Sequence, residues 1–231
     1  NVQVGPEVGP ARTTVTATLP LPSAAGTLLV ADLRSVTSPS NKPFTAQTGW
    51  VSANNAFLDA TAHTQIWYYP NNPGGIASAA FGVSPNSIDA VAQMSEWRNV
   101  ATVSPLDTSG TVTVGANQLT ATVSTSGATM AADELVITDD GFKPQVGQTV
   151  APAAGWTSLA NDQPNGFQAE YRLDLPAAVA SETLTSTVAT TWALVIAAFK
   201  PVSAAAGVVL DPGFYYFNGS GFAGGGGICL N

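Results

Sequence analysis

Side chains able to act as a nucleophile or a general base are few in this sequence and lie far apart. His63 is the only histidine and Cys229 the only cysteine among the 231 residues. A Ser-His-Asp site would require His63 as its base, but no Gly-x-Ser-x-Gly turn presents a serine. One histidine and one cysteine also give no support to a zinc site. The sequence therefore predicts no catalytic residue, no metal site and no cofactor.

Two pairs of adjacent acids are the remaining candidates for catalysis. Asp133-Glu134 or Asp139-Asp140 could serve as a carboxylate pair of the kind that hydrolyses glycosidic bonds. Asp139, Asp140 or Asp107 could alternatively supply oxygen ligands to a calcium ion, although the Asp-x-Asp-x-Asp spacing is missing. The simpler interpretation is that the first pair begins a strand and the second forms a turn, with solvated side chains in both. We therefore expect a protein that is not an enzyme.

Two Gly-Trp pairs are candidates for sugar binding. Trp50 and Trp156 could present aromatic faces for stacking on a glycan, and each follows a glycine. Because the pair occurs twice in matching contexts, packing in the core is the favoured interpretation. Carbohydrate binding or host adhesion remains the alternative function.

Charged side chains are scarce, at 10% of the residues, and the seven basic ones stand singly along the chain. The net charge is −8, and without a basic cluster nucleic acid is disfavoured as a partner. No apolar run approaches the ~20 residues that cross a bilayer, so we expect no membrane span. An uncharged, threonine-rich surface is typical of extracellular or particle-bound proteins.

Period-two alternation and β-branched residues predict an all-β protein. The longest apolar run, Thr191 to Val202, predicts a strand buried on both faces. The segment from Val91 to Val100 has the same outline and predicts a second central strand. From Phe167 to Leu175 the alternation predicts inward and outward sets of side chains. The inward set includes Ala169, Tyr171 and Leu173, and the outward set is Glu170, Arg172 and Asp174.

Several landmarks recur in the same order about 100 residues later in the chain. Such a recurrence predicts two similar halves that pack face to face as a jelly-roll β-sandwich with an internal pseudo-duplication. We expect an N-terminal arm at 1–14, the sandwich at 15–202 and a C-terminal extension with a glycine-rich tail at 203–231. The matched landmarks are Leu28-Leu29-Val30 with Leu135-Val136-Ile137, Gly49-Trp50 with Gly155-Trp156, Tyr69 with Tyr171, and Trp97 with Phe199. The expected core residues are Trp97, Tyr171, Leu194 and Phe199.

A family resemblance covers roughly residues 15–202. The segments that carry it include AAGTLLVADL, TQIWYYP, VAQMSEWRNV, ADELVIT, AGWTSL, FQAEYRLDLP and TTWALVIAAFKP. Together they resemble a jelly-roll module of bacteriophage virion proteins and bacterial extracellular proteins. The resemblance implies a non-enzymatic structural component on the virion surface or outside the cell, such as a capsid decoration, a tail or fibre subunit, or part of another extracellular assembly.

The C-terminal extension combines aromatic residues, a glycine run and an apolar end. Exposed apolar residues of this kind usually mark an interaction surface, and a glycine-rich tail is costly to order alone. We therefore predict a homo-oligomer or contacts with other virion or filament subunits. The alternatives are that the tail covers its own sandwich, or that the partner is a cell-surface glycan. The candidate assembly interface consists of Phe214, Tyr215, Tyr216, Phe217, Phe222, Ile228 and Leu230.

Overall fold

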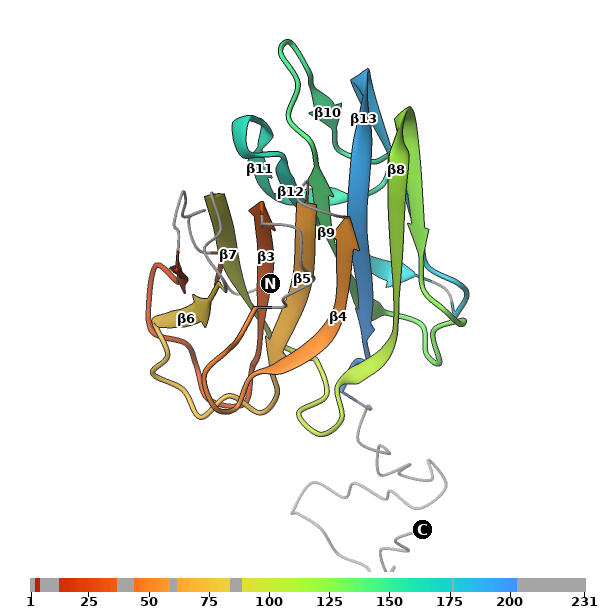
Figure 1. The fold of residues 1–231 in the computed structure, drawn as a ribbon. Coiled ribbons are helices and arrows are strands. Elements are labelled where there is room, and N and C mark those ends of the chain that lie inside the picture. Colours follow the sequence, from red (N-terminus) through yellow and green to blue (C-terminus); the bar gives the residue numbers. More distant parts are fainter. Residues whose placement is uncertain are drawn as a thin grey trace, which may run out of the picture.

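The computed structural model describes residues 3–4, 13–36, 44–58, 62–83, 89–175 and 177–202. These residues form antiparallel sheets packed as a β-sandwich, with one 3-10 turn, η1 (Gln163–Asn165) (Figure 1). The prediction of an all-β protein is confirmed. No helix in these ranges is long and apolar enough to cross a membrane.

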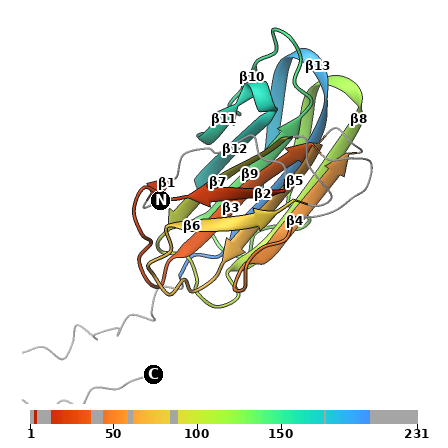
Figure 2. The same cartoon turned by 60° about the vertical axis from the view of Figure 1, so that its left-hand side comes forward.

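The first half, residues 3–100, contains one main sheet and a small cover. The order in the sheet is β1 (Gln3–Val4), β7 (Asp89–Trp97), β3 (Leu28–Val36), β5 (Ala62–Tyr69) and β4 (Val51–Leu58). A two-stranded sheet of β2 (Thr14–Thr18) and β6 (Ser78–Gly82) crosses its outer face (Figure 2). Alternating burial along β2 and β6 directs their apolar side chains onto β3 and β7.

The second half, residues 106–202, contains the other main sheet. Its order is β10 (Val150–Ala151), β13 (Ser181–Phe199), β9 (Glu134–Phe142), β12 (Phe167–Leu175) and β11 (Thr157–Asp162). Strand β8 (Leu106–Ser124) pairs with β13 as well. Residues 192–199 of β13 lie between β8 and β9 and are fully buried, as predicted for the apolar run.

Strands β8 and β13 form one long antiparallel ribbon that folds over onto itself (Figure 1). Each strand has 19 residues, and the register between them shifts between Thr185 and Trp192. Beyond the fold, Ser126 donates its backbone N–H to the carbonyl of Ser109 at 3.0 Å. The far part of the ribbon, residues 119–124 and 181–186, therefore covers the outer face of the second sheet much as β2 and β6 cover the first.

The strand order is the same in the two main sheets. It is β4-β5-β3-β7 in the first half and β11-β12-β9-β13 in the second. In the ladders, Leu28 lies opposite Trp97, and Leu135 lies opposite Phe199. A Greek key would place the second strand of each set between the first and the third, so this order does not support the jelly-roll detail of the prediction.

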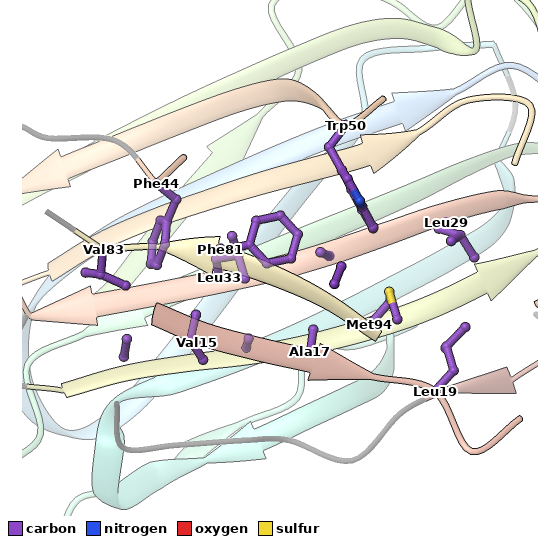
Figure 3. Packing of buried hydrophobic residues seen from close by; sticks show 14 residues of the cluster. Val15, Ala17, Leu19, Leu29, Leu33, Phe44, Trp50, Phe81, Val83 and Met94 are labelled. Atoms are coloured by element: carbon purple, nitrogen blue, oxygen red, sulfur yellow. The ribbon is translucent and has the colours of Figure 1, made fainter. Parts of the chain in front are cut away.

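Buried apolar side chains gather in three main layers. The first outer cluster lies between β2–β6 and the first sheet and includes Val15, Ala17, Leu33 and Phe81 (Figure 3). The inner cluster joins the two main sheets and includes Leu28, Val30, Leu135 and Phe199. The second outer cluster lies under the far part of the ribbon and includes Val123, Leu184, Trp192 and Leu194.

Aromatic residues from both halves meet in the inner cluster. Tyr68 and Phe199 have ring centroids 5.4 Å apart, and Trp97 and Tyr171 have centroids 4.9 Å apart. Trp97, Phe199 and Leu194 are buried as predicted, and Tyr171 is partly buried against this cluster. The two sheets therefore share one aromatic interior, and dissociation of either half would expose it to solvent.

The exposure expected from the alternation in Phe167–Leu175 is partly wrong. Glu170 lies on the outer face, as predicted, but is fully buried, and Leu173 of the inward set is 42% exposed. The folded ribbon covers the outer face around Glu170, and alternation along one strand cannot reveal such a cover. The landmark Tyr69 is also displaced by one residue, because Tyr68 lies opposite Val30 just as Tyr171 lies opposite Ile137.

Candidate functional site

The first candidate site is a pair of aspartates between the two main sheets. Asp32 on β3 and Asp139 on β9 are both fully buried. One carboxylate oxygen of Asp139 accepts the backbone N–H groups of Leu33, at 2.9 Å, and Gln65, at 3.2 Å. Neither carboxyl oxygen of Asp32 has a hydrogen-bond donor. Equivalent strands of the two halves thus bring two aspartates together in different environments.

The pKa values of this pair follow from burial and mutual repulsion. Burial raises the pKa of Asp32 well above its usual range. Burial also raises the pKa of Asp139, and the charge of Asp32 raises it further, while the N–H groups of Leu33 and Gln65 and the charge of Arg34 lower it. Two carboxylates cannot both ionise cheaply in a dry interior. Ionisation of both carboxyl groups is therefore disfavoured, and Asp139 is the oxygen acceptor that ties β9 to β3 and β5.

The second candidate site is the acid triad, which we define as Asp140, Glu170 and Glu182. Asp140 lies on β9 and Glu170 on β12, both on the outer face of the second sheet, and Glu182 lies on the far part of the ribbon. The hydroxyl of Thr138 has one hydrogen to donate and lies 3.0 Å from Glu182 and 3.3 Å from Asp140. Glu182 is also within hydrogen-bonding reach of the other two carboxyl groups. The triad thus joins the cover to the sheet beneath it.

All three members of the acid triad resist ionisation. Burial raises the pKa of Asp140 well above its usual range, and the charges of Glu170 and Asp139 raise it further. Burial and the charge of Asp140 have the same effect on the pKa of Glu182. Burial raises the pKa of Glu170, although hydrogen bonds from Glu182, from the N–H of Ala153 and from Gln168 lower it. The triad therefore retains protons at a pH where ordinary carboxyl groups have lost them.

A surface cleft of about 350 Å³ lies where the two halves meet. Trp97, Leu135 and Val100 contribute buried apolar surface, and Arg98 and Asp133 add charged groups. The cleft lies beside the bridge between Val100 and Pro201, through which the two halves pair at their ends. Its remaining lining residues are Asn99, Leu173, Pro201 and Val202.

The two tryptophans considered as candidates for sugar binding are core residues. Trp50 is 8% exposed and Trp156 is 9% exposed. The ring of Trp50 packs edge-on against Phe81 at 5.2 Å and Tyr69 at 5.7 Å. Trp156 belongs to the second outer cluster. The preferred interpretation of the two Gly-Trp pairs is therefore confirmed, and neither ring forms an open platform for a sugar.

The predicted solvation of the acidic pairs is wrong for Asp139-Asp140 and for Glu134. Asp139 and Asp140 lie inside β9 rather than in a turn, because this strand is paired on both sides. Glu134 is buried and accepts the N–H of Ala131 at 3.0 Å, whereas Asp133 is exposed. Asp107 accepts the N–H of Met130 at 2.8 Å and lies beside Glu134, whose pKa is raised by burial and further by the charge of Asp107.

The other predicted residues are dispersed. His63 is buried on β5 with its ring stacked on Phe44 at 5.7 Å, so it faces the core. The candidate assembly interface lies outside the described residues. Its members are Phe214, Tyr215, Tyr216, Phe217, Phe222, Ile228 and Leu230, and Cys229 lies in the same segment.

The sequence analysis named Asp139 and Asp140 as candidates but missed Asp32, Glu170 and Glu182. The aspartate pair had a usable signal, since Asp32 follows Leu28-Leu29-Val30 at the same spacing as Asp139 follows Leu135-Val136-Ile137. Glu182 carried no such signal, because it approaches Asp140 only through the folding of the ribbon.

Within the described ranges, no three His, Cys, Asp or Glu side chains are arranged to hold a metal ion. Comparison of the chain with protein-family models, with curated proteins and with solved structures found no match. The functional argument therefore depends on the geometry of this chain.

Proposed function

We propose that the protein is a non-enzymatic structural component of a phage virion, as a capsid decoration or a tail or fibre subunit, or of another extracellular assembly. The observation that carries the proposal is that Asp139, Asp140, Glu170 and Glu182 are fully buried. Carboxyl groups in these positions hold strands together and cannot meet a dissolved substrate. A partner would therefore bind the surface of the described residues rather than these buried carboxyl groups.

The exposed face of the ribbon supports this proposal. Hydroxyl groups pair across it, with Thr122 and Thr183 at 2.8 Å and Ser124 and Ser181 at 3.0 Å. These side chains satisfy one another without charge, and such a surface remains soluble while adding little ionic-strength dependence to subunit packing. The virion or extracellular location belongs to the same proposal.

Light scattering on the purified chain tests the assembly role. We expect a defined oligomer or filament, and we expect deletion of residues 204–231 to abolish it while the sandwich keeps its melting temperature within a few degrees. A full-length chain that stays monomeric, or a truncated chain that still assembles, would contradict the role assigned to the C-terminal extension.

A duplicated unit is the second element of the proposal. It is supported by the shared strand order and by equivalent turns, since Gly49 and Gly155 both have positive φ, at 97° and 82°. The following tryptophans each donate a backbone N–H to the residue three positions earlier. Each half alone would expose the inner cluster, so fragments 1–104 and 105–231 should associate when mixed. Stable, separately monomeric fragments would count against the proposal.

Glycan binding is the alternative function, and the cleft gives it one specific location. Arg98, Asn99 and Asp133 supply polar groups around an apolar floor that includes Trp97, a mixture suited to a sugar ring. Binding on a glycan array that is lost in Arg98→Ala and kept in Arg172→Ala would favour this function. No binding by the oligomeric protein would leave the structural role as the better account.

A further inference from the structure

The acid triad lies at the contact between two layers that can separate. Glu182 belongs to the far part of the ribbon, whereas Asp140 and Glu170 belong to the sheet beneath it. The ribbon reaches this position only by folding over beyond residue 114 of β8. Any force between Glu182 and the two acids below it therefore acts to hold the cover down or to push it away.

Two oxygens of the acid triad require a proton. Asp140 Oδ1 and Glu182 Oε2 have no hydrogen-bond donor and no solvent exposure. A buried carboxylate oxygen without a donor is costly. A carboxyl proton shared between Glu182 and its neighbours removes this cost, since a protonated carboxyl group can donate. The hydrogen bonds of the acid triad are therefore satisfied when protons are bound, and these oxygens lack donors when the protons are lost.

The groups that face the triad offer no compensating positive charge. The charge of Asp139, on the opposite face of β9, acts on Asp140 in the same unfavourable sense as Glu170. None of the hydrogen bonds to the triad within the described residues comes from Lys, Arg or His. Lys143, at the end of β9, is exposed, and Arg172 on β12 lies near Gly155. The covering strands contribute apolar Ala121, Val123, Val150 and Leu184.

The first half provides an internal reference without such a triad. Ladder positions equivalent to Thr138, Asp140 and Glu170 are occupied by Ala31, Leu33 and Trp67. Its cover, β2 and β6, contributes Val15, Ala17 and Phe81 (Figure 3). It also contributes Ala79. That contact contains no titratable group from these residues, so its closure should not depend on pH.

We propose that the acid triad is a proton-dependent latch, which holds the far part of the ribbon on the second sheet when protonated and releases it when ionised. The ligand of the latch is the proton itself. Ionisation of any two members places like charges together in a site closed to water, and the cheapest relief is to lift Glu182 into solvent with its strand. The sheet and the inner cluster remain intact in the released state. This device does not depend on which assembly the protein serves.

Hydrogen–deuterium exchange of the full-length chain between pH 5 and pH 8.5 tests the proposal, after correction for the intrinsic pH dependence of exchange. We expect protection of residues 119–124 and 181–186 to fall at least tenfold over this range. Protection of β2 and β6 should stay constant. Wild-type protection of the ribbon that does not change with pH, or that changes equally in both covers, would overturn the proposal.

Variants identify the groups responsible. The triple variant D140N/E170Q/E182Q cannot ionise at these positions, so its ribbon should have the same protection at pH 5 and pH 8.5. Should it fail to fold, Glu182→Gln alone should reduce the pH-dependent loss at least threefold. The matched control is Glu96→Gln, because Glu96 is a buried carboxylate of the first half, bound to the N–H of Ala24 at 2.7 Å. Triad variants that keep the wild-type pH dependence, or a control that loses it, would overturn the latch.

Discussion

The two halves of this protein use the same strand order to build interiors of different chemistry. In the first half, apolar side chains such as Leu33 and Phe81 hold the cover on the sheet. In the second half, carboxyl groups of Asp140, Glu170 and Glu182 occupy the corresponding contact. The same strand order therefore accommodates a contact between cover and sheet that is apolar in the first half and contains three acids in the second.

In the inner cluster, equivalent substitutions in the two halves should lower the free energy of unfolding by similar amounts. Phe199→Ala and Trp97→Ala each remove a fully buried aromatic ring at equivalent ladder positions. We expect each to lower the free energy of unfolding by roughly 3–5 kcal/mol in denaturant titrations. Val146→Ala, at a fully exposed position, is the control, with a change within about 0.5 kcal/mol. A loss below about 1 kcal/mol for either ring would show that the halves do not share this core.

Substitutions in the aspartate pair should affect stability differently in the two halves. Asp139→Ala leaves the N–H groups of Leu33 and Gln65 without their acceptor, at a cost of about 1–3 kcal/mol for each. Asp32→Asn removes a carboxyl group that has no donor and whose raised pKa opposes folding at pH 7, so it should not lower the free energy of unfolding there. Equal losses for the two variants in urea titrations would contradict the asymmetry.

Folding of the ribbon requires a glycine in the second half. A Cβ on Gly110 would overlap the carbonyl oxygen of Ser124, whereas one on Gly127 would meet nothing within 4 Å. Gly110→Ala should therefore lower the free energy of unfolding by about 1–3 kcal/mol, as an overpacked site does. Gly127→Ala should leave it within about 0.5 kcal/mol. Thermal melts compare the pair, and equal melting temperatures would refute the close approach.

Replacing one acid of the triad by an apolar residue should make the contact between cover and sheet in the second half more like the apolar contact in the first half. Glu182→Leu removes a group whose ionisation opposes folding, so it should raise the free energy of unfolding at pH 8 by on the order of 1 kcal/mol. At pH 5, closer to the ordinary pKa of a glutamate, the gain should be smaller because the raised pKa of Glu182 opposes folding less there. A variant that is less stable than wild type at pH 8 would show that Glu182 stabilises the ionised protein.

Most of the strands could be predicted from sequence, and the buried acids could not. The patterns in Val91–Val100, Phe167–Leu175 and Thr191–Val202 located β7, β12 and the central part of β13, because each pattern reflects local pairing and burial. Asp139-Asp140-Gly141 indicated a turn because Asp and Gly favour turns. Pairing of β9 with both β12 and β13 overrides that preference, and these partners are distant in sequence.

The same limit applies to Glu170 and Glu182. Alternation shows which residues share a face of a strand, but not whether another layer covers that face. The cover of the second sheet arises from the folding of β8 and β13 near residues 115–118 and 187–191, far along the chain from β12. Only the repeated spacing of Asp32 and Asp139 could have indicated a special interior from sequence alone.

The free energy of unfolding of the wild-type protein at pH 5 and at pH 8 tests the central claim most directly. Burial raises the pKa values of Asp32, Asp139, Asp140 and Glu182 well above their usual range, so the folded chain binds more protons than the unfolded chain above pH ~4. Stability must then fall as pH rises from that point through the raised pKa values. We predict a larger free energy of unfolding at pH 5 than at pH 8 in urea titrations. An equal or larger value at pH 8 would contradict the account.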